Sequence, residues 1–123
     1  MEREAYQIEY DAFVQGYKLG QVSGEQVGET IMKMVQYYGD QNSSLAAREI
    51  LSNKKAAENV ELVDEATGKQ ITVSKAETLT KASQEYSAFL TARVHLQNIE
   101  QCINALKALQ KGVLNEYSHM GGV

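Results

Sequence analysis

Apolar residues recur at steps of three and four along much of the chain, the spacing that places them on one face of an α-helix. Between residues 3 and 19 we predict a first helix, because this repeat is carried there by Tyr6, Tyr10, Phe13, Val14 and Tyr17. Gly20 and the polar residues after it are expected to end that helix.

Two more short helices are predicted before residue 60. Ser23 is followed three residues later by Gln26, a capping-box pattern that starts a helix. Gly39 can adopt the left-handed conformation that ends one, and the polar stretch 40–44 that follows predicts a turn. A third and more polar helix is expected over residues 45–59. Residues 1–59 therefore form the predicted helical N-terminal part.

The hydrophobic period changes to two between residues 60 and 73. Val60 and Leu62, and then Ile71 and Val73, alternate with polar residues, which is typical of strands. Gly68 lies in the polar stretch between them and can supply the positive φ that a tight connection needs. We predict a small β-hairpin over residues 60–73, docked on the helices or on another subunit because an isolated hairpin is marginal.

One long helix is predicted for residues 74–118. Ser74 and Glu77 form a second capping-box pattern, and no proline interrupts the residues that follow. A heptad-like apolar stripe runs through this helix, at Phe89, Ala92, Leu96, Ile99, Ile103, Leu106, Val113 and Tyr117. Because such a stripe is typical of supercoiled helix packing, we predict a helical bundle or a coiled-coil-like homo-oligomer.

Composition narrows the class of protein. The 123 residues fit a single domain, and 43% hydrophobic residues with no proline favour a folded, mainly α-helical chain. The formal charge of −4 disfavours general affinity for nucleic acids. The sequence shows neither a signal peptide nor an apolar run of the roughly 18 residues that a membrane span needs. We therefore expect a soluble cytoplasmic protein that does not enter membranes.

Candidate catalytic and metal-binding residues are few. Cys102 is the only cysteine, and the residues one helical turn from it are not basic, so we expect a buried apolar side chain and not a nucleophile. His95 has no second ligand at metal-binding spacing. We predict no catalytic residues, no metal, no cofactor and no small-molecule substrate, and therefore a protein that is not an enzyme.

Basic residues concentrate between the third predicted helix and the start of the last one. Those that could contact phosphates are Arg48, Lys54, Lys55, Lys75 and Lys81, and Tyr86 is available for stacking on a base. Such a set could follow the backbone of single-stranded nucleic acid. The alternative is a solvated surface, because glutamates are interleaved with these residues.

The arrangement also resembles a known family. A lysine-bearing helix (45–59), a short non-helical insert (60–73) and a final helix running from Tyr86-Ser-Ala-Phe-Leu to Leu109-Gln-Lys resemble bacteriophage replication and recombination accessory proteins, in particular the UvsY-type recombination mediator. The resemblance is architectural and covers residues 30–118. It implies a ring-like oligomer assembled through the final helix, which binds single-stranded DNA and helps to load a RecA-like recombinase.

Two functions therefore remain open at this point. The first is an oligomeric, phage-derived accessory protein that binds single-stranded DNA or a DNA-processing protein. The second is a protein-interaction module, such as an assembly chaperone, an inhibitor or a virion component, that binds no nucleic acid. The acidic balance favours the second, and the resemblance favours the first.

Overall fold

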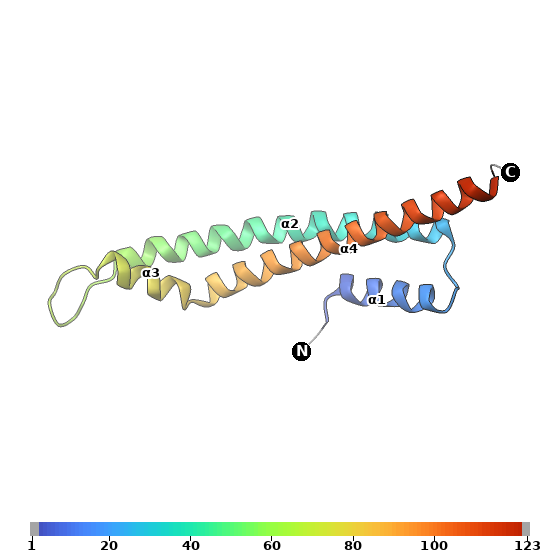
Figure 1. Ribbon diagram of the computed structural model, residues 1–123. Coiled ribbons are helices and arrows are strands. Elements are labelled where there is room, and N and C mark those ends of the chain that lie inside the picture. The colour runs from blue at the N-terminus through green and yellow to red at the C-terminus, as the bar shows by residue number, and fades with distance from the viewer. Residues whose placement is uncertain (1–2, 122–123) are drawn as a thin grey trace. The chain divides into compact units, whose positions relative to one another are not determined.

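The computed structural model describes residues 3–121, with side chains described as far as Gly112. It is helical, as predicted, and its elements are α1 (Ala5–Lys18), α2 (Gly24–Val60), α3 (Val73–Lys81) and α4 (Gln84–Gly121) (Figure 1). The chain divides into two compact units. The first unit comprises the residues up to Asp40 and those from Gln97 onward, and the second unit is Gln41–Leu96. Helices α2 and α4 each contribute to both units.

The first helix and the start of the second follow the sequence closely. α1 ends in a Schellman-type turn, in which the amide of Gln21 donates to the carbonyl of Gly16 and the amide of Gly20 donates to Tyr17. Gly20 has a φ of 71°, a conformation that side chains other than glycine's rarely adopt. Ser23 and Gln26 form the predicted capping box, with the Ser23 amide 2.8 Å from Oε1 of Gln26.

The predicted turn at residues 40–44 is wrong, because α2 runs without interruption through it. Gly39 is helical and does not take the positive φ that would end the helix. In place of a turn, Gln41 points its side-chain amide at α4 and donates to the carbonyl of Ala92 over 3.0 Å. Packing against a neighbouring helix thus outweighs the weak local preference of residues 40–44 for a turn.

The predicted β-hairpin over residues 60–73 is also wrong. These residues form the end of α2, a loop and the first residue of α3, and the loop holds a single antiparallel bridge between Val63 and Gln70. Two backbone hydrogen bonds close the loop, one from Asp64 to Lys69 and one from Ile71 to Leu62. Gly68 has the expected positive φ of 71°. The segment is too short to continue the ladder into strands.

The predicted helix over residues 74–118 is interrupted after Lys81, which separates α3 from α4. Ser83 causes the interruption, because its hydroxyl donates to the carbonyl of Thr80 over 2.6 Å and also accepts from the amide of Tyr86. It therefore caps the start of α4 in competition with a continuous helix. α3 begins earlier than predicted, since Thr72 and not Ser74 accepts from the amide of Lys75.

The first unit has a core of large side chains. Helix α1, the N-terminal part of α2 and the C-terminal part of α4 contribute to it, and its buried members are Tyr6, Met34, Ile99, Ile103 and Leu106. Half-buried aromatic residues surround them, including Tyr10 and Phe13 of the apolar face predicted for the first helix. This core matches the predicted helix periodicity.

The second unit is built differently. Its buried residues are small or polar, namely Ser52, Asn59, Ala76 and Ala92. No large aliphatic or aromatic side chain between residues 41 and 96, a range that the structure describes in full, is buried. Asn59 links α2 to α3, because its amide donates to the Thr80 hydroxyl over 2.9 Å. Small interior residues let the helices pack closely but leave the larger apolar side chains outside.

Candidate interaction surfaces

Large apolar side chains lie on the outside of the second unit. Exposed ones are Ile50, Leu51, Val60, Leu62, Val63, Val73, Leu79 and Val94. A scattered exposed aliphatic residue is ordinary on a protein surface, whereas several close together mark a binding surface. Val60 and Val73, which are 51% and 70% exposed, belong to such a group because both line one cavity.

That cavity is a groove between the end of α2 and α3, which we call the α2–α3 groove. It has a volume of about 250 Å³ and is lined by Ala56, Val60, Val73, Ala76, Glu77, Thr80, Lys81 and Tyr86. Its surface is almost wholly apolar, since the valine and alanine carbons and the Tyr86 ring form the walls. Glu77 and Lys81 are separated by one turn of α3, and no ion pair joins these two described residues. The groove therefore offers apolar walls and two charges of opposite sign.

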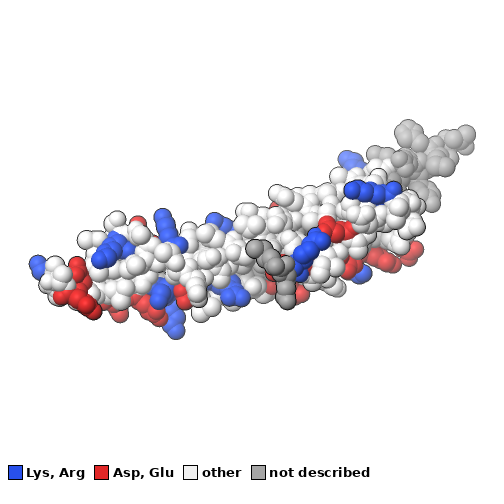
Figure 2. Space-filling model, turned by 90° about the horizontal axis from the view of Figure 1, so that it is seen from below, with Lys and Arg blue, Asp and Glu red and all other residues white. Residues whose placement is uncertain are grey.

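The basic residues predicted to bind nucleic acid all lie in the second unit. Arg48, Lys54, Lys75 and Lys81 are exposed, and Lys55 is half-buried. Residues 41–96 contain seven Lys or Arg and seven Asp or Glu, so this unit has no net charge. On the face drawn in Figure 2, blue and red side chains are intermingled and do not form one broad basic area. Binding of nucleic acid by these residues stays a prediction.

The residues predicted to form an oligomer interface are divided between the two units. In the first unit, Ile99, Ile103 and Leu106 are buried in the chain's own core. In the second unit, Phe89 and Leu96 are half-buried. Val113 and Tyr117 lie outside the residues whose side chains the structure describes. The part of the stripe that is buried here packs on α1 and α2 of the same chain, which accounts for its periodicity without a second subunit.

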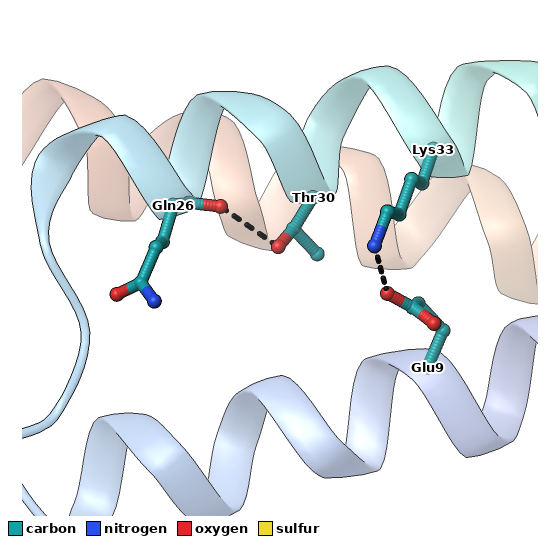
Figure 3. A network of polar contacts seen from close by, with 4 residues as sticks. All are labelled: Glu9, Gln26, Thr30 and Lys33. Atoms are coloured by element: carbon teal, nitrogen blue, oxygen red, sulfur yellow. Dashed lines mark hydrogen bonds and ion pairs between the residues drawn. The ribbon is translucent and has the colours of Figure 1, made fainter.

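Helix α1 is held to α2 in the first unit by a charged contact as well as by the core. Nζ of Lys33 lies 2.8 Å from Oε1 of Glu9 (Figure 3). The hydrogen bond to this carboxylate raises the pKa of Lys33. Thr30, one turn before Lys33 on α2, is buried and donates from its hydroxyl to the carbonyl of Gln26 over 2.8 Å. The Lys33–Glu9 ion pair therefore links α1 to α2, and the hydroxyl of the nearby Thr30 is paired as well.

A second groove lies in the first unit, between α1 and α4, and we call it the α1–α4 groove. It has a volume of about 450 Å³. Arg3, Gln7 and Asp11 line it from the N-terminal segment, and Asn98, Gln101 and Ala105 line it from α4. The Asn98 amide lies 3.5 Å from the Tyr6 hydroxyl at this groove. Unlike the α2–α3 groove, this one exposes polar and apolar surface in similar amounts.

Residues with catalytic potential do not gather at either groove in a reactive arrangement. Cys102 lines the α1–α4 groove, where burial raises the pKa of its thiol and so disfavours the reactive thiolate. Among residues 3–112, no group of three or more His, Cys, Asp or Glu side chains could hold a metal ion. Within the described part of the chain, no helix combines the length and the apolar character that crossing a membrane would require.

Sequence reasoning missed both grooves. Val60 and Val73 were assigned to strands, and the α2–α3 groove forms only because both lie on helices that pack through Asn59 and Ala76. The sequence feature that could have predicted the α2–α3 groove is the run of small residues in the third predicted helix. Small residues allow helices to pack closely, and the larger apolar side chains next to them then stay exposed.

The described residues thus form a mainly helical protein with an apolar groove between α2 and α3 and a mixed groove between α1 and α4. Comparison with protein-family models, with curated proteins and with solved structures gives no match for this chain. The resemblance to the UvsY-type mediators therefore stays a prediction.

Proposed function

We propose that this chain is a non-enzymatic protein-interaction module whose α2–α3 groove binds an amphipathic helix of a partner protein. The supporting observation is the composition of the second unit. Its interior holds small and polar residues, while eight large aliphatic side chains are exposed. Burying such side chains stabilises a complex by about 25 cal/mol per Å² of apolar surface removed from water.

The form of the groove favours a helix as the ligand. Two packed helices present a furrow with apolar walls, into which a helix can insert residues spaced by three and four. Glu77 and Lys81 at the groove would pair with a basic and an acidic residue on the flanks of the bound helix. The partner helix is thus expected to carry two or three aliphatic side chains that enter the groove. It should also carry a basic residue that faces Glu77 and an acidic residue that faces Lys81.

A peptide-display selection against the immobilised protein tests this proposal. Helical peptides with aliphatic residues at steps of three and four should be enriched, and they should bind the Val73→Asp variant at least tenfold more weakly. A buried carboxylate in place of a valine accounts for a loss of this size. Val94→Asp is the matched control, because Val94 is also exposed in the second unit but does not line the groove.

Two outcomes would reject the proposal. One is a selection that enriches no peptide over the background. The other is a set of peptides that bind wild type, Val73→Asp and Val94→Asp equally well. Because Val73 is 70% exposed, its replacement should leave the helical content unchanged, which circular dichroism checks.

Single-stranded DNA is the second candidate ligand. It is favoured by the location of all five predicted basic residues in one unit, where none of them forms an ion pair with a carboxylate of the described side chains. A fluorescent oligonucleotide should then bind at low salt, with an affinity that falls steeply as salt rises. Lys54→Glu combined with Lys81→Glu should abolish that binding. Absence of binding at low salt would leave only the protein-interaction function.

A further inference from the structure

The two walls of the α2–α3 groove differ in charge. The wall on α2 is formed by Ala56 and Val60, which lie one turn apart and carry no charge. The rim on α3 is formed by Val73, Glu77 and Lys81, which follow one another at steps of four and are all exposed. A helix bound in the groove therefore meets both charges on the same flank.

The inner side of α3 adds no charge to this pattern. Ala76, which is 3% exposed, and the half-buried Thr80 line the groove where α3 packs against α2. The Thr80 hydroxyl accepts from the Asn59 amide over 2.9 Å and donates to the carbonyl of Ala76 over 2.9 Å. Because this hydroxyl is already bonded within the chain, charge recognition in the groove depends on Glu77 and Lys81.

Glu77 and Lys81 give the groove a direction. Val60 is the last residue of α2 and Val73 is the first of α3, so both lie at the end of the groove next to the loop that joins these helices. Glu77 and then Lys81 follow along α3 toward the break before α4. Neither of them is engaged in an ion pair with another described side chain, so both charges are available to a ligand.

We infer that the partner helix lies antiparallel to α3, with an acidic residue facing Lys81 and a basic residue four positions later facing Glu77. This inference rests on the proposed function and adds to it the direction of the bound helix and the order of its charges. Two arrangements would match the charges of the groove. One is an acidic-first helix antiparallel to α3, and the other is a basic-first helix parallel to it.

Helix electrostatics favour the antiparallel arrangement. Within a single helix, an acidic residue four positions before a basic one is more stabilising than the reverse order. A partner with the acidic-first order is therefore better ordered before it binds, and it loses less conformational freedom on binding. Antiparallel helices also place the partially positive N-terminus of the partner beside the partially negative C-terminus of α3. Both effects act in the same direction.

Two peptides of equal composition test the order of the charges. Both are built on the tightest-binding helical sequence from the peptide selection, with one Glu and one Lys four positions apart on one flank, and they differ only in which comes first. In fluorescence anisotropy, the acidic-first peptide should bind the wild-type chain at least about threefold more tightly, a ratio within the range of exposed charge pairs.

Exchange of the two charges in the groove separates contact with the protein from the helicity of the peptide. The double variant Glu77→Lys/Lys81→Glu should bind the acidic-first peptide more weakly and the basic-first peptide more tightly than wild type does. A difference in peptide helicity alone would be the same for both proteins. Lys54→Glu/Glu58→Lys is the matched control, because it exchanges two exposed charges one turn apart on α2 outside the groove and should change neither affinity.

Photocrosslinking tests the direction of the bound helix. A benzophenone group at the N-terminus of the acidic-first peptide should label the end of the groove at Lys81 and Tyr86, as mapped by mass spectrometry. The same group at the C-terminus should label the opposite end, at Val60 and Val73.

Three results would overturn the inference. They are equal affinities of the two peptides for the wild-type chain, affinities that the exchange of Glu77 and Lys81 leaves unchanged, and an N-terminal label found at the loop end of the groove. The proposed function survives each of them as long as Val73→Asp weakens both peptides, because apolar binding in the groove does not require a fixed direction. Peptide binding that does not depend on Val73 would instead reject the proposed function, and this inference with it.

Discussion

Replacing Ile99 with alanine tests whether the apolar stripe of α4 belongs to the chain's own core. Ile99 is 1% exposed and packs in the first unit with Met34 and Leu106. The change removes three carbon atoms, which corresponds to about 2–3 kcal/mol of lost transfer free energy at about 0.8 kcal/mol per carbon. A residual cavity adds to this, so we expect the free energy of unfolding to fall by about 2–5 kcal/mol.

Urea unfolding followed by circular dichroism measures this change, with Val94→Ala as the control on the same helix. Val94 is exposed, so its truncation should alter the free energy of unfolding by less than about 0.5 kcal/mol. The effect of Ile99→Ala should also be the same at low and high protein concentration. If the stripe were held mainly by another subunit, the loss would depend on concentration, because subunit association then contributes to stability. A loss below about 1 kcal/mol, or one that varies with concentration, would refute the core assignment.

Three further predictions concern polar and titratable groups. Burial raises the pKa of Tyr6 above its usual 10.0, so the stability that its neutral hydroxyl contributes is present below that pH and is lost as pH rises through the folded-state pKa. The midpoint of urea unfolding should therefore fall at strongly alkaline pH, and less so for Tyr6→Phe; an equal decline in both would exclude this source. Cys102 should react with iodoacetamide more slowly in the folded chain than in urea, as followed by mass spectrometry, and equal rates would contradict its burial. Asn59→Ala should lower the free energy of unfolding by about 1–3 kcal/mol in a urea titration, because a buried hydrogen bond to Thr80 is lost, and an unchanged midpoint would show that this bond contributes nothing.

Local capping signals in the sequence predicted helix boundaries correctly where no contact with a distant part of the chain competes with them. The Ser23–Gln26 capping box starts α2, and Gly20 ends α1, because both depend only on backbone amides a few residues away. The apolar repeat likewise predicted which residues of α4 are buried in the first unit, namely Ile99, Ile103 and Leu106.

The remaining boundaries depend on contacts between segments far apart in the chain. Gly39 predicts a helix end in isolation, but the neighbouring Gln41 binds the backbone of α4 at Ala92 and the helix continues. Ser83 has the opposite effect, since its short side chain binds the backbone of Thr80 and Tyr86 and separates two helices. Gln41 and Ser83 both have polar side chains that can bind backbone groups. The sequence does not reveal whether such a side chain will bind the backbone of its own helix or that of a distant one.

The same limit applies to the grooves. A repeat of apolar residues predicts that a helix has a buried face, but not how much of that face the chain itself can cover. In the first unit the large side chains meet one another and form a core. In the second unit Ser52, Asn59, Ala76 and Ala92 occupy the interior, so the bulkier residues on the same helices stay in solvent.

The two units therefore imply different roles for their surfaces. The α1–α4 groove is lined by polar and apolar side chains, and the two charged ones, Arg3 and Asp11, already pair with each other. The α2–α3 groove carries apolar side chains whose burial can supply affinity for a different protein. Because the grooves share no residue, Val73→Asp should weaken peptide binding, whereas Gln7→Glu should leave it unchanged. Equal peptide binding by wild type and Val73→Asp, or a loss of binding in Gln7→Glu, would contradict binding at the α2–α3 groove.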